Sequence, residues 1–218
     1  WSPSSPTSRD GLRIVGAGID ATTLKVVSAT KGKLTVAIGN KDVSDFLNGC
    51  EVSDLRIDCD AGNQAVDTTN GVSVGAVALT GTHVHLRRVR VNNFGIKLST
   101  NGTSGPRCVV LSTGRAHYNN GGQPVDCVID NCVADLPYVA ATPPTNPVTC
   151  LHLGAAMNPT QGGSNTWHRA CVIRNCFVDC GSASANMSQD FRGIAVYGGI
   201  GSIVECIRVL YCRRGGPY

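Results

Sequence analysis

The chain has 218 residues, of which 42% are hydrophobic and 16% charged, enough apolar sequence for the core of one domain. The formal net charge of +4 at pH 7 is small, and no basic run carries interleaved aromatic residues, so no nucleic-acid partner is expected. No apolar run reaches the length of a membrane-spanning helix, so no membrane partner is expected either.

One short sequence pattern recurs along the chain, with copies that start at Cys50, Val84, Cys127, Cys171 and Ser202. Within each copy, apolar or small positions follow one another at steps of two, three and two residues. A step of two is the alternation of a strand with one buried face, and a step of three inserts a residue that turns the chain. Each copy therefore predicts a strand, a bend and a second strand.

The bend of each copy carries a pair of mostly polar residues: Ser53–Asp54, Arg87–Arg88, Asp130–Asn131, Arg174–Asn175 and Glu205–Cys206. Asn and Asp tolerate the left-handed backbone conformation that a sharp bend needs, and their side chains bond nearby backbone groups. Asn131 and Asn175 are therefore predicted to have a structural role.

A third strand is expected in each repeat. The candidates are GAVALTG (75–81), FGIKLS (94–99), TCLHLG (149–154) and RGIAVYG (192–198), with Val77, Ile96, Leu151 and Ile194 facing the core. A chain that repeats three strands and their corners winds into a solenoid, in which each coil bonds to the next and stacks like residues on like. The predicted fold class is all-β, a parallel β-helix with three strands per coil.

The 11 cysteines are an odd number, so at least one is unpaired within the chain. Cys127 and Cys171 share one repeat position and Cys132 and Cys176 share another, so each pair is expected to stack about one coil apart, within disulfide range. Reduced cysteines that serve as small core residues are the favoured alternative. Because Cys127 and Cys132 face inward and no histidine and cysteine partners are clustered with them, no metal site and no cofactor is predicted.

Four stretches carry a resemblance to a known family: GLRIVGAGIDATTLKV (11–26), DLRIDCDAGNQ (54–64), THVHLRRVRVNNFG (82–95) and CRRGGPY (212–218). They resemble right-handed β-helix proteins of the pectate-lyase-like superfamily, which includes polysaccharide lyases, hydrolases and phage tailspike depolymerases, and in particular secreted bacterial members of undefined activity. The resemblance covers nearly the whole chain. It implies a right-handed, single-stranded parallel β-helix and an extracellular or cell-surface location.

In these proteins an earlier strand precedes the segment that resembles GLRIVGAG, and the chain continues beyond the segment that resembles RGGPY. Residues 1–218 are therefore expected to form a single β-helix domain that is a segment of a longer solenoid. The motifs of the characterised enzymes do not carry over: the polygalacturonase pattern Asn-Thr-Asp, Asp-Asp, Gly-His-Gly and Arg-Ile-Lys is absent. The calcium-binding acidic cluster with catalytic arginine of the classical pectate lyases is absent too.

Long insertions border the predicted third strand, at roughly 60–74, 99–123, 135–148, 154–169 and 181–192. Loops of this length on one strand face are expected to wall a groove that holds an extended polymer. Lys97 and His152 are expected side by side on the floor of that groove, on adjacent coils. A lysine beside a histidine keeps the imidazole neutral and stabilises an enolate-like charge while the histidine removes a proton.

This is the chemistry of β-elimination on a uronic acid polymer, so Lys97, His152 and Tyr197 are the predicted catalytic residues. The residues predicted to bind the carboxylates of the substrate are Arg115, His117, Tyr118 and Arg192. The alternative is that all of them are ordinary solvated surface residues. A hydrolase would need two carboxylates at a fixed separation across the groove, whereas most acidic residues here sit at bends or turns.

Two functions follow from the same coils. The first is a secreted protein that binds an acidic polysaccharide or cleaves it, as a polysaccharide lyase if it is an enzyme. The alternative is a structural subunit of an extracellular fibre or filament, a homo-oligomer assembled by end-to-end stacking. Its basis is that a parallel solenoid without caps offers free backbone donors and acceptors at both ends.

Overall fold

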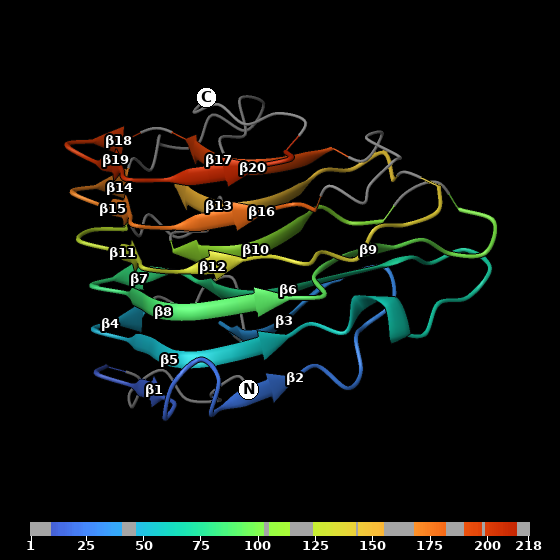
Figure 1. The fold of residues 1–218 in the computed structure, drawn as a ribbon, viewed down its shortest axis with the longest axis horizontal. Helices are drawn as coiled ribbons and strands as arrows, with labels where there is room; N and C mark the ends of the chain where they lie inside the picture. Colours follow the sequence, from blue (N-terminus) through green and yellow to red (C-terminus); the bar gives the residue numbers. More distant parts are fainter. Residues whose placement is uncertain are drawn as a thin grey trace.

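The computed structural model describes residues 10–40, 47–102, 105–113, 124–142, 144–154, 168–181, 190–197 and 199–212. Over these ranges the protein is all-β, with parallel sheets and one short 3₁₀ helix, η1 (Ala61–Asn63). The strands are stacked in layers that follow chain order from the N-terminal to the C-terminal side (Figure 1).

The largest sheet has ten strands and contains all five copies of the repeated pattern. Its strands are β1 (Arg13–Val15), β2 (Thr23–Lys25), β5 (Glu51–Asp58), β8 (His85–Asn92), β11 (Val128–Asp130), β12 (Val133–Ala134), β15 (Val172–Arg174), β16 (Phe177–Asp179), β19 (Ile203–Glu205) and β20 (Arg208–Leu210). All pairings in it are parallel, and Ile129 lies between Leu86 on one neighbour and Ile173 on the other. The positions aligned by the sequence pattern are therefore the positions aligned in the sheet.

A second sheet runs behind the first in Figure 1. It consists of β3 (Leu34–Gly39), β6 (Val72–Leu79), β10 (Cys108–Thr113), β13 (Val148–Gly154) and β17 (Phe191–Tyr197), paired in parallel in that order, with β9 (Gly95–Lys97) beside β6. β3, β6, β10, β13 and β17 belong to successive layers of the stack, one strand in each layer.

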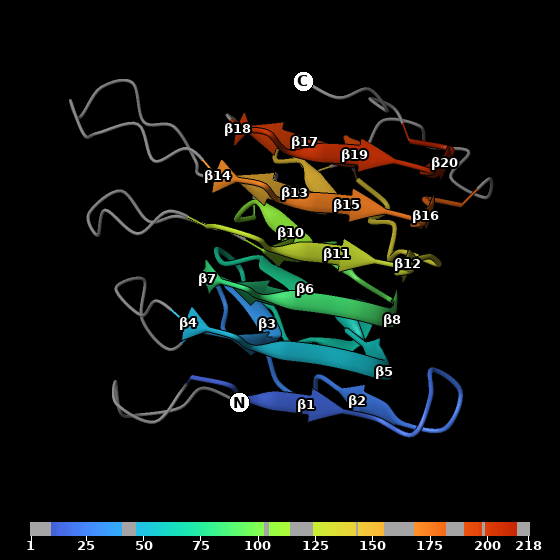
Figure 2. The same cartoon turned by 90° about the vertical axis from the view of Figure 1, so that its left-hand side faces the viewer.

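A third column of short strands lies along one side of the stack (Figure 2). It is formed by β4 (Leu47–Asn48) with β7 (Gly81–Thr82) and by β14 (His168–Arg169) with β18 (Gly199–Ile200). Single parallel bridges from Val125 to Thr82 and to Arg169 join the two pairs. The described chain therefore passes through three columns of parallel strands in each repeat.

Corners with left-handed backbone lie at both ends of the strands of the ten-stranded sheet and also within that sheet. In the described part of the chain, the non-glycine residues of positive φ fall into three columns: His83, Asp126 and Ala170; Asp54, Arg88, Asn131, Asn175 and Cys206; and Asp60, Asn93, Leu136 and Tyr211. The second column is the second residue of each predicted bend, so that prediction is confirmed. Left-handed backbone is costly for residues such as Arg88 and Leu136, and it persists because the strands on both sides are fixed in the sheets.

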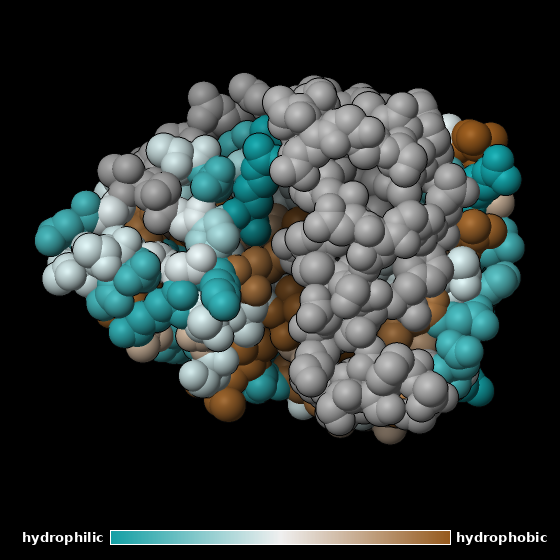
Figure 3. All heavy atoms as spheres, turned by 180° about the vertical axis from the view of Figure 1, so that it is seen from behind, coloured by the Kyte–Doolittle hydropathy of each residue, from teal (hydrophilic) through white to brown (hydrophobic). Residues whose placement is uncertain are grey.

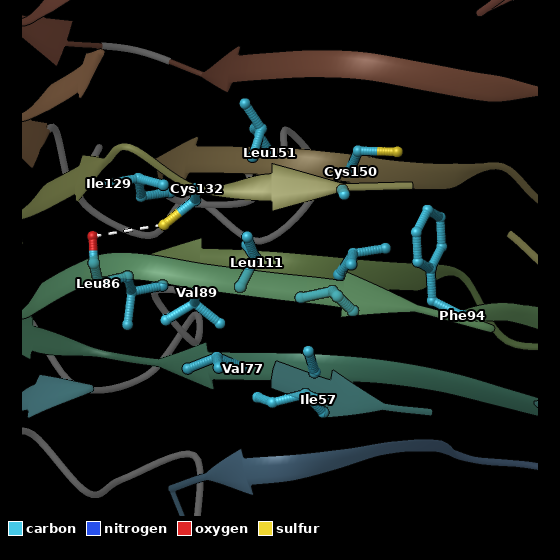
Figure 4. Packing of buried hydrophobic residues seen from close by; sticks show 14 of the residues in the cluster. Ile57, Val77, Leu86, Val89, Phe94, Leu111, Ile129, Cys132, Cys150 and Leu151 are labelled. Atoms are coloured by element: carbon cyan, nitrogen blue, oxygen red, sulfur yellow. Dashed lines mark hydrogen bonds between the residues drawn. The ribbon is translucent and has the colours of Figure 1, made fainter. Parts of the chain in front are cut away.

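The space between the two larger sheets is filled by aliphatic side chains and cysteines (Figure 4). Leu86, Ile129 and Ile173 are fully buried in one column, and Val77, Leu111 and Leu151 contribute to the same core from the second sheet. Burial of this kind contributes about 25 cal/mol per Å² of apolar surface. Stacked apolar columns are therefore the main favourable term that holds neighbouring layers together.

One predicted third strand is wrong in its position. FGIKLS (94–99) was expected to continue the column of Val77, but β9 pairs antiparallel with the start of β6. The strand that follows β6 in the column is β10, and Leu111 lies where Ile96 was expected. Both segments carry apolar residues at strand spacing, so periodicity alone does not tell which of them joins the column.

The stacked cysteines are buried, and all of them are free thiols. Cys127 and Cys171 precede the paired residues Val128 and Val172, and Cys132 and Cys176 precede the paired residues Val133 and Phe177, so each cysteine pair lies on adjacent layers. The Cys132 thiol donates to the carbonyl of Leu86, at 3.6 Å, and burial raises its pKa. Their packing is that of small core residues. Within the described ranges, no helix is long and apolar enough to cross a membrane.

Candidate functional site

A line of four residues crosses the second sheet on the side away from the core. Ala78, Ser112, His152 and Ala195 are direct neighbours on β6, β10, β13 and β17. All four are buried, yet none packs into the core cluster. They mark the face of the sheet where the groove was predicted.

The central contact of this line joins Ser112 to His152. Ser112 Oγ and His152 Nδ1 are 2.9 Å apart, and both side chains are buried. A hydroxyl in hydrogen-bond contact with an imidazole is polarised by it, and the imidazole is held in one orientation. The sequence prediction missed Ser112 because residues 99–123 were interpreted as an insertion, which hid the strand that carries this serine.

Lys97 does not lie beside His152. It ends β9, opposite Val72 at the start of β6, whereas the line of His152 crosses β6 at Ala78, near its other end. At about 3.3 Å per residue this separates the Lys97 backbone from that line by roughly 20 Å along the sheet. The Lys97 ammonium donates to the carbonyl of Gln64, at 2.6 Å. The expected Lys97–His152 pair is therefore not formed, because β10 and not β9 is the neighbour of β13.

Arg192 lies on β17 opposite Thr149 and is held by an acidic neighbour. Its Nε and Nη2 donate to Oδ2 of Asp190, at 3.3 and 3.0 Å. About a fifth of each side chain of this ion pair is exposed. The other carboxylate oxygen of Asp190, Oδ1, is buried and accepts no hydrogen bond in the described chain. The guanidinium of this part-exposed pair is the group that suits recognition of a carboxylate on a ligand.

The remaining predicted site residues are placed only in part. Tyr197 ends β17 opposite Gly154, and its side chain lies outside what the structure describes. Arg115, His117 and Tyr118 lie outside the described residues. The segments 114–123 and 155–167, which follow β10 and β13 in the chain, also lie outside the described residues.

Asn131 and Asn175 turn the chain at the second column of corners, with φ of 55° and 52°. Asn131 N–H donates to the carbonyl of Arg174, and Asn175 N–H to that of Glu205. The Asn175 side chain also donates to the carboxylate of Asp130, at 3.2 Å. These bonds link each bend to a neighbouring layer.

Three arginines on the outer face of the ten-stranded sheet are paired with acids of neighbouring layers. The pairs are Arg88–Asp54, Arg90–Asp135 and Arg174–Asp130. The hydrogen bonds from Arg88 hold the pKa of the Asp54 carboxyl below its usual range. Exposed pairs of this kind contribute about 0–1 kcal/mol each, and their charges cancel locally. Arg192 is paired with Asp190 in the same way, so charge pairing alone favours neither face for binding an anionic polymer.

The opposite side of the molecule carries a band of hydrophobic surface bordered by hydrophilic residues (Figure 3). No cluster of three or more potential metal ligands occurs among the described residues.

Comparisons with protein-family models, with curated proteins and with solved structures give no match to this chain.

Proposed function

We propose that the chain is part of a right-handed, single-stranded parallel β-helix of the pectate-lyase-like class, located outside the cell or at its surface. The parallel register in chain order, the three strand columns and the three columns of left-handed corners support the β-helix. The right-handed sense follows the strong preference of parallel crossover connections.

We further propose that this β-helix binds an acidic polysaccharide along the outer face of β6, β10, β13 and β17. The observation that carries the proposal is the part-exposed Arg192–Asp190 pair at the start of β17 in the second sheet. A guanidinium recognises the carboxylate of a uronic acid through paired hydrogen bonds. Ser112 and His152 form the buried floor beneath this ligand.

Binding is better supported than cleavage by β-elimination. That reaction needs a base together with a group that stabilises the developing enolate charge. His152 is a candidate base, but Lys97 is roughly 20 Å away along the sheet. The proposed activity is therefore recognition of the polymer.

Arg192→Ala is expected to weaken binding to polygalacturonate or alginate roughly tenfold or more, because a hydrogen bond to a charged group contributes about 1.5–3 kcal/mol. Titration calorimetry on the folded variants measures it. Arg174→Ala is the matched control, because it removes an arginine of another aspartate pair on the other sheet and should leave the affinity unchanged. Absence of binding by the unmodified chain to every acidic polymer would refute the proposal, and so would equal weakening in both variants.

A specific observation favours the structural alternative as well. Ile203 and Val204 on β19 are 50% and 40% exposed, although Val204 continues the buried column of Ile129 and Ile173. At the other end, a cavity of ≈540 Å³ is lined by apolar residues of β1, β2 and β3 and their neighbours, including Leu12, Ile14, Leu24, Val26 and Ile38. A second copy stacked end to end would cover both surfaces.

If copies stack in this way, Val204→Asp should raise the concentration needed for assembly roughly tenfold or more, because it buries an unpaired charge in the interface. Light scattering and electron microscopy of the same sample detect the assemblies. Leu136→Asp serves as the control, because this exposed leucine lies at a corner in the middle of the stack. A monodisperse monomer at high concentration of the unmodified chain would exclude the alternative.

A further inference from the structure

Two cysteines meet where the last described layer rests on the layer before it. Cys180 directly follows β16, and Cys212 comes shortly after β20. β16 and β20 pair in parallel, with Asp179 opposite Leu210, and Cys180 N–H donates to the carbonyl of Leu210 at 3.1 Å. The paired backbone therefore brings the residues that follow β16 and β20 together on neighbouring layers.

The sulfur atoms of this pair are much closer than those of its neighbour. Cys180 Sγ and Cys212 Sγ are 2.7 Å apart, whereas Cys150 Sγ is 3.9 Å from Cys180 Sγ. Non-bonded heavy atoms normally rest at roughly 3.5–4.0 Å, and a disulfide has its sulfurs at about 2.05 Å. Only a small movement separates the Cys180–Cys212 contact from a covalent bond.

We propose that Cys180 and Cys212 are the thiols of this chain that oxidise to a disulfide, which fastens the layer of β19 and β20 to the layer of β15 and β16. A small disulfide such as oxidised glutathione supplies the oxidising equivalents by thiol–disulfide exchange. One cysteine thiolate attacks it and releases a molecule of glutathione. The second cysteine thiolate then displaces the other glutathione, so the S–S bond forms as two thiol protons and two electrons leave the protein.

Access distinguishes this pair from the other stacked cysteines. Cys212 is partly exposed, whereas Cys127, Cys132, Cys171 and Cys176 are buried. The thiols of Cys127 and Cys132 also donate to backbone carbonyls, at 3.2 and 3.6 Å. An oxidant therefore reaches Cys212 without the core opening, and it does not reach those four thiols.

The Cys180–Cys212 bridge would act where the stack is least enclosed. The layer of β19 and β20 exposes Ile203 and Val204, and in the described chain its strands pair only with β15 and β16. A hydrogen bond with Cys180, together with burial, raises the pKa of the Cys212 thiol. Because the thiolate is the reactive form, the bridge should form slowly at neutral pH and faster as the pH rises.

The test is carried out on Cys206→Asn, because Cys206 is exposed and would form a mixed disulfide with glutathione. Asn suits the positive φ of that corner, as it does at Asn131 and Asn175. After incubation with oxidised glutathione, the protein is denatured, alkylated and analysed by mass spectrometry. Two thiols should be protected from alkylation, and the linked peptides should join Cys180 to Cys212.

Cys206→Asn with Cys212→Ser is the matched control and should keep all its thiols free. The same disulfide mapping on the unmodified chain should also find the Cys180–Cys212 linkage. This result would show that the bridge is not caused by misfolding of the variants. A bridge between any other two cysteines, Cys150–Cys180 included, would overturn the proposal. If the folded protein is oxidised at pH 9 and all of its thiols are then alkylated after denaturation, the proposal is also overturned.

Discussion

Ile129→Ala is expected to lower the free energy of unfolding by about 2–5 kcal/mol, as buried Ile or Leu to Ala changes do. Ile129 is fully buried, and its neighbours in the stack, Leu86 and Ile173, belong to two different layers. The missing atoms would leave a cavity between three layers that the fixed spacing of the strands cannot close. Denaturant unfolding followed by circular dichroism measures the loss.

Val128→Ala is the matched control for this prediction. Val128 precedes Ile129 on the same strand, points to the other face and is only partly buried. Its loss should be below about 1 kcal/mol, because the shortened side chain leaves no closed cavity. Equal losses at both positions would mean that the strand does not present alternate residues to core and solvent.

Gly75→Ala is expected to destabilise the protein by about 3 kcal/mol or more, at the upper end of overpacking effects. A Cβ on Gly75 would stand 1.9 Å from the carbonyl oxygen of Val109. That oxygen belongs to the backbone of β10, so it moves only if β6 and β10 separate. The reduction in melting temperature, or failure of the variant to accumulate as folded protein, is the result to look for.

Gly201→Ala is the control for Gly75→Ala, because it introduces backbone strain without a steric contact. Gly201 has φ of +63°, and no described atom lies within 4 Å of the position that a Cβ would take there, so only the left-handed conformation opposes the substitution. This should cost about 1–2 kcal/mol. If Gly201→Ala proves more damaging than Gly75→Ala, the close approach of β6 and β10 is not the constraint described here.

Much of the large sheet follows from the repeated pattern alone. Its alignment of Leu86, Ile129 and Ile173 is the pairing register, and its bends fall at Asn131 and Asn175. This succeeds because a one-residue error in a two-residue alternation would turn every core residue outward. The pattern is therefore a strong constraint wherever one face of a strand is buried.

The candidate site was harder to predict because it depends on where an insertion interrupts a repeat. GIKL at 95–98 and CVVL at 108–111 are both short apolar runs, and only the pairing with β6 decides between them. The choice of the first run placed Lys97 beside His152 and concealed Ser112. Arg192 begins a predicted strand, whereas its partner Asp190 falls within the predicted insertion at 181–192.

The columns of left-handed corners have a consequence for how such a chain can change its length. Asp54 and Arg88 are 34 positions apart in the sequence, and Asp130 and Arg174 are 44 positions apart. In both pairs the arginine of one layer nevertheless donates to the aspartate at the bend of the layer before it. Extra residues are absorbed between corners and leave the corners aligned. An in-frame duplication or deletion of one whole repeat would preserve every junction between layers, so the molecule can grow or shorten in units of a single layer while each loop diversifies independently.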